Sequence, residues 1–444
     1  MEGHLQGLSF AKVSSDILRV LTPPGKRYIL LLGGMAALLL FGAYAWLHQI
    51  YTGMGVAGIT HPVYWGIYIT NFVFWVGLAH SGTLISAILY LFRASWRTSI
   101  HRSAEAMTIF ALMTAGTFPL IHLGRVWYFY WLLPYPNQRG LWVNFRSPLI
   151  WDVFAVGTYF LVSLMFFYTG LIPDLAAARD AFRGWRRKLY GILSLGWQGS
   201  DREWRHYRAA YLFMAGLATP LVISVHSVVS WDFAMSIVPG WHSTIFAPYF
   251  VAGAIFSGSA MVITLLVPLR KLFRLEEYIT LRHFENLAKV IIFTSLIVTY
   301  SYANEFFIAW YTGNVAEQES FSWRAFGHYA PLFWSMVVCN SALPLAFFFR
   351  RVRRNIASLF IISILINVGM WLERFVIIVT SLAHEYAPYG WGHYSPSWVE
   401  IGITAGSFAL FFFLFGVFVK LFPVISITEV REQLHASEKE VAAP

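Results

Sequence analysis

Ten long runs of apolar residues, separated by polar or charged segments, dominate the hydropathy pattern of the chain. A helix needs about 20 apolar residues to cross the hydrocarbon core of a bilayer, so each run is long enough for one membrane-spanning helix. The predicted spans cover about residues 28–50, 63–92, 104–131, 149–172, 207–230, 245–269, 286–311, 329–349, 355–380 and 398–421. The pattern predicts an all-α integral membrane protein with ten transmembrane helices.

Composition agrees with this prediction. Of the 444 residues, 58% are hydrophobic and only 12% are charged, far outside the range of soluble domains. No small-residue cleavage site follows the first apolar run, so we expect it to be a retained span and not a signal peptide. The predicted organisation is an N-terminal tail over residues 1–27, a membrane domain over 28–421 and a C-terminal tail over 422–444.

Basic residues set the predicted orientation, because lysine and arginine accumulate on cytoplasmic loops. Twenty-seven of the 32 lie in the two tails and in alternate loops. Both termini are therefore expected in the cytoplasm. The same bias explains the net charge of +10 through topology and contact with anionic lipid, and gives no reason to expect a nucleic-acid partner.

The chain has a single cysteine, Cys339, within an apolar run. One cysteine cannot ligate an iron–sulfur cluster alone, attach a c-type haem or form an internal disulfide. We therefore expect neither haem nor iron–sulfur cluster in this chain, and we assign it no metal site. Electron carriers of those kinds would belong to partner subunits.

Ionisable residues inside the spans mark candidate functional positions, because burying them in a membrane is costly. With the predicted orientation, most fall in the outer half of the membrane. That set comprises His122, Arg125, Asp152, His226, Asp232, Glu305, Glu373 and Arg374. The inner half is poorer and offers His80 and Glu105, which suggest a thin proton route.

An outer-half site of this composition suits a quinol. Oxidising a quinol releases two protons with two electrons, so its site needs hydrogen-bond partners for two ring oxygens and a proton acceptor. Histidine and a carboxylate in apolar surroundings can both accept protons near neutral pH. His122 and Asp152 fit the ring-contact and acceptor roles, Asp232 fits a second acceptor, and Arg125 fits a counter-charge.

The other ionisable residues have weaker functional and stronger structural interpretations. Pocket-supporting roles are predicted for His226, Glu305, Glu373 and Arg374. Each could instead have a purely structural partner, and the adjacent charges of Glu373 and Arg374 are expected to point in different directions. His80, alone at its depth, could be a helix-packing histidine, and His122 with Arg125 could extend toward the membrane surface.

Several long segments resemble a known family. They are NFVFWVGLAHSGTLISAILYLFRASWRTSIHRSAEAMTIFALMTAGTFPLIHLGR at residues 71–125, YWLLPYPN at 130–137, SPLIWDVFAVGTYF at 147–160 and WDFAM at 231–235. These segments resemble the NrfD/PsrC family of quinone-interacting membrane subunits. They are most similar to the ten-helix members found in alternative complex III, and the resemblance extends over essentially the whole chain.

The resemblance implies two four-helix bundles, at about residues 63–230 and 245–380, with the first and last helices outside them. It implies a menaquinol-oxidising subunit of a respiratory or photosynthetic quinol:electron acceptor oxidoreductase in the bacterial inner membrane. Implied partners are c-type cytochrome subunits, a periplasmic iron–sulfur subunit and a second NrfD-like membrane subunit. The family's quinol-site pattern maps to His122, Asp152 and Asp232, and proton translocation is an implied further activity.

Other classes stay open from the sequence. A membrane b-type cytochrome normally repeats two histidines along one span, and no span here shows that spacing. A transporter or proton channel would use the same intramembrane carboxylates and histidines. A non-catalytic anchor, or a proton-conducting paralogue in the same complex, would share the fold without oxidising quinol.

Overall fold

The computed structural model describes residues 8–442, and it contains the ten helices long and apolar enough, by length and composition, to cross a membrane. The ten predicted spans are thereby confirmed as candidate transmembrane helices. Several of them consist of consecutive helical segments. Their bounds are α2 Lys26–Thr52; α3 Ile67–Thr83 with η2 Leu84–Ile88 and α4 Leu89–Leu91; α5 His101–Ala115 with α6 Thr117–His122; α7 Pro148–Ala181; α9 Asp201–Ala234; α10 Phe246–Leu272; α11 Leu281–Tyr311; α13 Ala330–Val337 with η6 Val338–Ala342 and η7 Leu343–Phe348; α15 Ile356–Phe375 with η8 Val376–Thr380 and α16 Ser381–Ala383; and α17 Trp398–Leu421.

Shorter helices occupy the connections and tails. They are α1 Phe10–Val20, α8 Trp185–Leu193, α12 Val315–Phe326, α14 Arg350–Arg353 and α18 Ile427–Ala442, with short 3₁₀ segments that include η4 Val126–Leu132. The loop predicted at residues 173–206 is largely helical, because α7 continues through Pro173 and α9 begins early at a Ser200–Glu203 capping box. Hydropathy marks the membrane-embedded part of a helix, whereas caps determine its ends.

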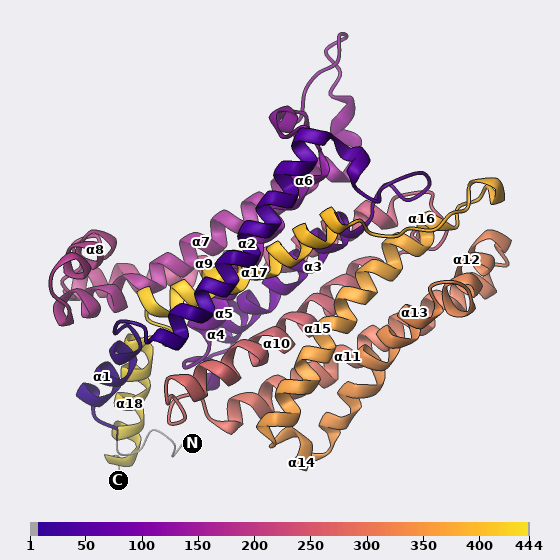
Figure 1. The fold of residues 1–444 in the computed structure, drawn as a ribbon. Coiled ribbons are helices and arrows are strands. Elements are labelled where there is room, and N and C mark those ends of the chain that lie inside the picture. The colour runs from indigo at the N-terminus through magenta and orange to yellow at the C-terminus, as the bar shows by residue number, and fades with distance from the viewer. Residues whose placement is uncertain (1–7, 443–444) are drawn as a thin grey trace.

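Several helices that are far apart in the sequence pack against one another (Figure 1). Helix α3 packs on α5 and α9, and α7 packs on α5 and α9; likewise α10 packs on α11 and α15, and α15 packs on α13. Contacts of α10 with α3 and α9 join these two sets. Helix α2 pairs with α17 so closely that a Cβ built on Gly42 would lie 2.6 Å from the Gly406 Cα, which is why glycine occupies both positions.

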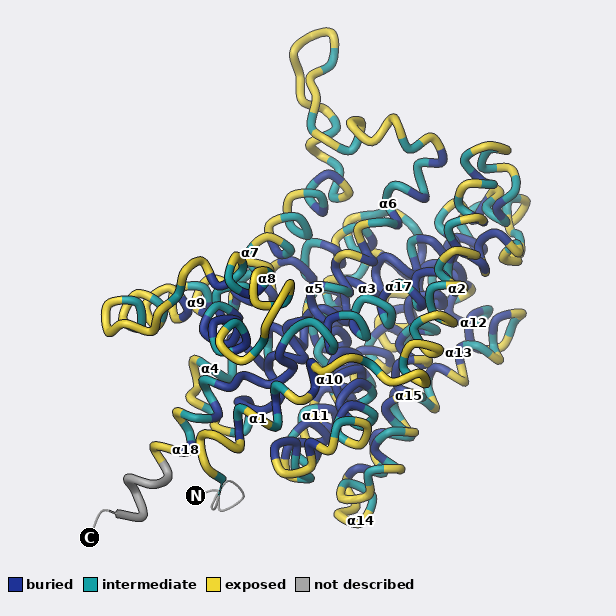
Figure 2. The backbone as a smooth tube through the Cα atoms, turned by 60° about the vertical axis from the view of Figure 1, so that its left-hand side comes forward, coloured by how far each residue is buried: buried dark blue, intermediate teal, exposed yellow. Residues whose placement is uncertain are grey.

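The two ends of the helical body differ. Helices α1 and α18 contact one another and lie at one end, which we call the terminal end (Figure 1). At the opposite end, which we call the distal end, the segment between α6 and α7 projects away from the other helices, and its surface is mostly exposed (Figure 2).

Candidate functional site

A cavity of about 630 Å³ lies toward the distal end, walled by α3, α5, α6 and α7 and reached by the last turn of α9. Most of its wall is apolar or aromatic, as at Trp65 and Phe160. Among the described residues that line it, only His122, Asp152 and Asp232 are ionisable. We call it the His–Asp–Asp cavity. Its size and its few polar groups are typical of a pocket for a largely apolar small molecule.

His122 lies at the last position of α6, where the chain turns sharply. Gly124 has a φ of +70° and fits against Met54, since an added Cβ would lie 2.5 Å from the Met54 Cγ. The side-chain amide of Gln49 donates a 2.9 Å hydrogen bond to the Ile121 carbonyl. A tight turn and a buried amide from α2 therefore hold the end of α6 and position His122 at the cavity.

Asp152 and Asp232 come from neighbouring helices that run in opposite directions. Pro148 begins α7, so Asp152 lies in its first turns, whereas Asp232 lies in the last turn of α9. The preceding residues, Trp151 and Trp231, pack edge to face with ring centroids 6.2 Å apart. The two carboxyl groups lie within reach of a side-chain hydrogen bond with one another. A single proton shared between them can therefore join the pair.

These three side chains have unused hydrogen-bonding capacity. His122 Nδ1, both carboxylate oxygens of Asp152 and Asp232 Oδ1 are buried, and with both carboxylates ionised none has a hydrogen-bond partner among the described residues. Buried polar atoms normally have partners. Among the described residues, no group of three His, Cys, Asp or Glu side chains is placed so that it could hold a metal ion. The unpaired atoms therefore fit an organic ligand with polar ring substituents.

The structure corrects the position predicted for Arg125. The third span ends at His122 and not near residue 131, because Gly124 breaks the helix and residues Val126–Leu132 form the separate 3₁₀ segment η4. Arg125 is exposed and does not line the cavity. Arg125 therefore lies beyond the third span, outside the site for which a counter-charge role was predicted.

His226, predicted to support the quinol pocket, lies elsewhere in the structure. It is fully buried next to His80, with ring centroids 4.5 Å apart, and does not line the His–Asp–Asp cavity. His80 Nδ1 donates to the Val76 carbonyl at 2.7 Å, and its ring lies 5.1 Å from that of Tyr159. His80 is thus not alone at its depth: the two histidines form a buried pair between α3 and α9.

Glu305, Glu373 and Arg374 form part of a second buried polar cluster, away from the cavity. Glu373 Oε1 lies 2.9 Å from Arg374 Nη1, and its other oxygen accepts a hydrogen bond from the Tyr302 hydroxyl. The charges of Glu373 and Arg374 therefore pair directly, contrary to the expectation that they point apart. Because α11 and α15 position this cluster and none of the three residues lines the cavity, direct roles there are not supported.

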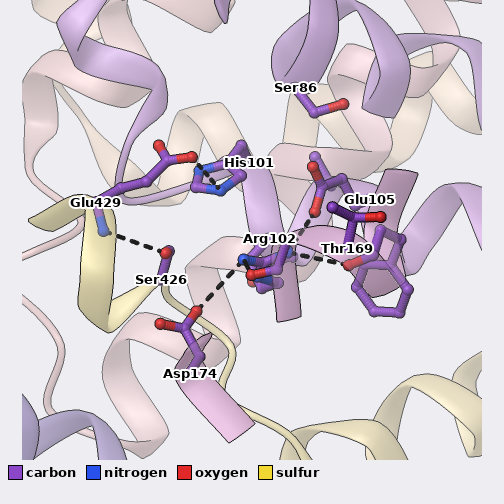
Figure 3. A network of polar contacts seen from close by, with 12 residues as sticks. Ser86, His101, Arg102, Glu105, Thr169, Asp174, Ser426 and Glu429 are labelled. Carbon is purple, nitrogen blue, oxygen red and sulfur yellow. Dashed lines mark hydrogen bonds and ion pairs between the residues drawn. The ribbon is translucent and has the colours of Figure 1, made fainter. Parts of the chain in front are cut away.

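Glu105 lies in a polar network near the terminal end (Figure 3). Arg102 lies between two carboxylates, 2.9 Å from Glu105 and 3.3 Å from Asp174. Asp174 also accepts bonds from the amide and hydroxyl of Thr428, both at 3.0 Å, which attach the C-terminal segment to α7. Arg102 was not singled out from the sequence. Its i,i+3 spacing from Glu105 is the signal that could have revealed the pair.

The fold and the cavity define a class: a multi-pass helical membrane protein with one apolar chamber carrying a histidine and two carboxyls. Comparison with known families narrows the class. The model of the family described as "Polysulphide reductase, NrfD" matches residues 55–384. The chain belongs to the NrfD family, and the family predicted from the sequence segments is confirmed.

Named relatives cover most of the chain. A putative membrane subunit of dimethyl sulfoxide reductase from Halobacterium salinarum is 28% identical over 84% of this chain and 86% of that protein. A selenate reductase subunit from Mesobacillus selenatarsenatis is 22% identical over 86% and 91%. The integral membrane subunit of an Hdr-like menaquinol oxidoreductase from Archaeoglobus fulgidus is 22% identical over 96% and 98%. The similarity therefore extends across nearly the full length of each relative.

Proposed function

We propose that the chain is the quinol-binding membrane subunit of a quinol:electron acceptor oxidoreductase complex, and that menaquinol is oxidised in the His–Asp–Asp cavity. The observation that carries the proposal is the meeting of His122, Asp152 and Asp232, with unpaired polar atoms, in one apolar chamber. Membership of the NrfD family and a relative named as part of a menaquinol oxidoreductase support the choice of ligand.

Each group has a distinct part in this chemistry. Oxidation of the quinol to the quinone releases two electrons and two protons. His122 binds one ring oxygen through its unpaired nitrogen and can accept one proton, while the Asp152–Asp232 pair accepts the other. The apolar wall holds the ring and tail. The two electrons leave to an acceptor on a partner subunit, and His80 and Glu105 are the proposed residues for proton movement toward the terminal end.

The type of complex is the finer part of the proposal. The segment resemblance supports alternative complex III, with c-type cytochromes, an iron–sulfur subunit and a second NrfD-like subunit as partners in a bacterial inner membrane. The relatives named for dimethyl sulfoxide and selenate reductases favour a second candidate, a complex that passes quinol electrons to a terminal reductase. Both candidates give this chain the same quinol chemistry. A non-catalytic anchor or proton-conducting paralogue would lack it.

The proposed topology has two four-helix bundles, with α2 and α17 outside them and both termini in the cytoplasm. The packing of α3, α5, α7 and α9, and of α10, α11, α13 and α15, supports the bundles. In a Cys339→Ala background, a membrane-impermeant thiol reagent applied to intact cells should label Arg139→Cys at the distal end and spare His435→Cys at the terminal end. Labelling of His435→Cys alone would reverse the orientation.

The quinol site is tested by menaquinol-dependent reduction of the purified complex, after its subunits and haems have been verified. Asp152→Asn removes the proton acceptor with little change in shape. We expect at least a tenfold loss of rate, since a positioned general base typically contributes about 100 to 10,000-fold. Asp201→Asn, an exposed change at the other end of the helix that carries Asp232, is the control and should keep the wild-type rate. An unchanged rate in intact Asp152→Asn complex would favour the anchor.

A further inference from the structure

A second cavity, of about 250 Å³, lies near the terminal end, between α1, the C-terminal end of α10 and that of α17. Both of those spans stop there, and α2 begins a few residues after α1. It therefore lies at the level where membrane-spanning segments meet the membrane surface. We call it the Arg274 cavity.

All the charged residues that line the Arg274 cavity are positively charged. Arg19, Arg274 and Lys420 line it, and no carboxylate of the described residues does. The Arg19 guanidinium contacts the Phe273 carbonyl at 3.4 Å and lies 3.9 Å from Asp16, its nearest ion-pair partner. Three cations with so little compensation create a strongly positive chamber at a membrane boundary, and such basic pockets between helices attract lipid phosphates.

Lys420 is held in place within this chamber. Its ammonium group donates to the Val20 carbonyl at 2.8 Å and to the Thr22 carbonyl at 3.4 Å. It also lies 4.6 Å from the centre of the Phe273 ring and 5.3 Å from that of Tyr28. These contacts fix a side chain that is otherwise flexible, and they leave one of its three donor positions for an anion.

Arg274 combines an unusual backbone with a free side chain. Its φ is +54°, a left-handed conformation normally given to glycine after a helix end. The Leu275 amide bonds back to the Arg270 carbonyl at 2.9 Å, which closes the turn. Its exposed guanidinium makes no hydrogen bond or ion pair with any residue of the range 8–442. The chain thus keeps an arginine where glycine would be easier, and its guanidinium is available to a ligand.

We propose that the Arg274 cavity binds the phosphate group of an anionic membrane lipid, with Arg274, Lys420 and Arg19 as its ligands. Phosphate chemistry alone also allows free inorganic phosphate. The lipid is favoured because Leu272, 64% exposed, is part of the same wall and offers an apolar surface to an acyl chain. Bound there, the lipid would connect α1 to α10 and α17. The inference is independent of quinol oxidation.

The test uses the full chain, stripped of lipid in detergent, and native mass spectrometry of bound lipid. The probes are phosphatidylglycerol, phosphatidylcholine with the same acyl chains, and inorganic phosphate. Arg274→Gln should weaken the tightest phosphatidylglycerol binding about fivefold, the effect of one cation at a membrane surface, and leave phosphatidylcholine binding unchanged.

The chain contains a matched control. Arg93 ends the second span with a φ of +53° and the same type of closing bond, from the Ala94 amide to the Leu89 carbonyl at 2.8 Å, but does not line the cavity. Arg93→Gln should leave phosphatidylglycerol binding at the wild-type level. Equal losses in both variants, or equal wild-type affinity for the two lipids, would overturn the proposal. Displacement of the lipid by millimolar phosphate would overturn its lipid part.

Discussion

Replacing Gly124 by alanine tests whether the turn after α6 is what positions His122. Two costs add at this residue. A left-handed conformation costs an L-residue about 1–2 kcal/mol, and Gly124 has a φ of +70°. In addition, the new Cβ would lie 2.5 Å from the Met54 Cγ and 2.9 Å from its Sδ. Since ordinary carbon contacts begin near 3.5 Å, either Met54 or the end of α6 must move by several tenths of an ångström or more.

Gly140→Ala separates these two costs. Gly140 has nearly the same φ, +73°, but an added Cβ there meets nothing within 4 Å. Both variants should lose similar backbone stability, whereas only Gly124→Ala should shift His122. Misplacing a reacting group by about 1 Å can cost about 100-fold in rate. We expect menaquinol-dependent reduction to fall at least tenfold in Gly124→Ala and to stay within about twofold of wild type in Gly140→Ala.

A second substitution checks the physical cause. Met54→Ala removes the Cγ and Sδ atoms that the new Cβ would meet, so the Gly124→Ala, Met54→Ala double variant should recover most of the lost rate. Thermal unfolding of each purified complex shows whether a rate loss reflects unfolding. The reasoning would be refuted if the two glycine variants lost the same activity, or if the double variant remained as slow as Gly124→Ala.

Two further outcomes follow from the buried charges. If Asp152 and Asp232 act as one proton-sharing unit, the Asp152→Asn, Asp232→Asn double variant should reduce the complex with menaquinol no more slowly than the slower single variant. A rate loss equal to the product of the two single losses would mean that the residues act independently. Arg102→Met leaves the carboxylates of Glu105 and Asp174 without their common partner, so unfolding in detergent should be easier by about 3–5 kcal/mol; a loss below about 1 kcal/mol would contradict the structural role assigned to this network.

The spans could be predicted because a membrane-spanning helix needs a long run of apolar residues, and such runs are visible in the hydropathy of the sequence. All ten candidate helices lie where apolar runs predicted them. The ends were less predictable, since they depend on local geometry and not on apolar content. Gly124 ends the third span early through a positive φ, whereas α7 continues through Pro173 to Ala181.

The candidate site could be predicted by depth and residue type, but not by direction around each helix. His226 and Asp232 are six residues apart on α9. At 3.6 residues per turn, that spacing separates their side chains by about 120° around the axis. Asp232 accordingly reaches the cavity while His226 packs on His80. Which helix face contacts which neighbouring helix depends on how all the helices pack together, and the sequence of one span does not determine that packing.

Predicted depth in the membrane does not separate residues that face a ligand from residues with a structural role. The structure offers a better criterion. A ligand-facing group should have both an unpaired polar atom and an adjacent chamber. Arg102 has one nitrogen, Nε, that is unpaired among the described residues, but it pairs with two carboxylates and does not line the cavity. His226 has unpaired nitrogens, yet it does not line the large chamber and its neighbour is another histidine. Asp152 meets both conditions, so it is the residue at which a quinol function and a purely structural membrane anchor make opposite predictions.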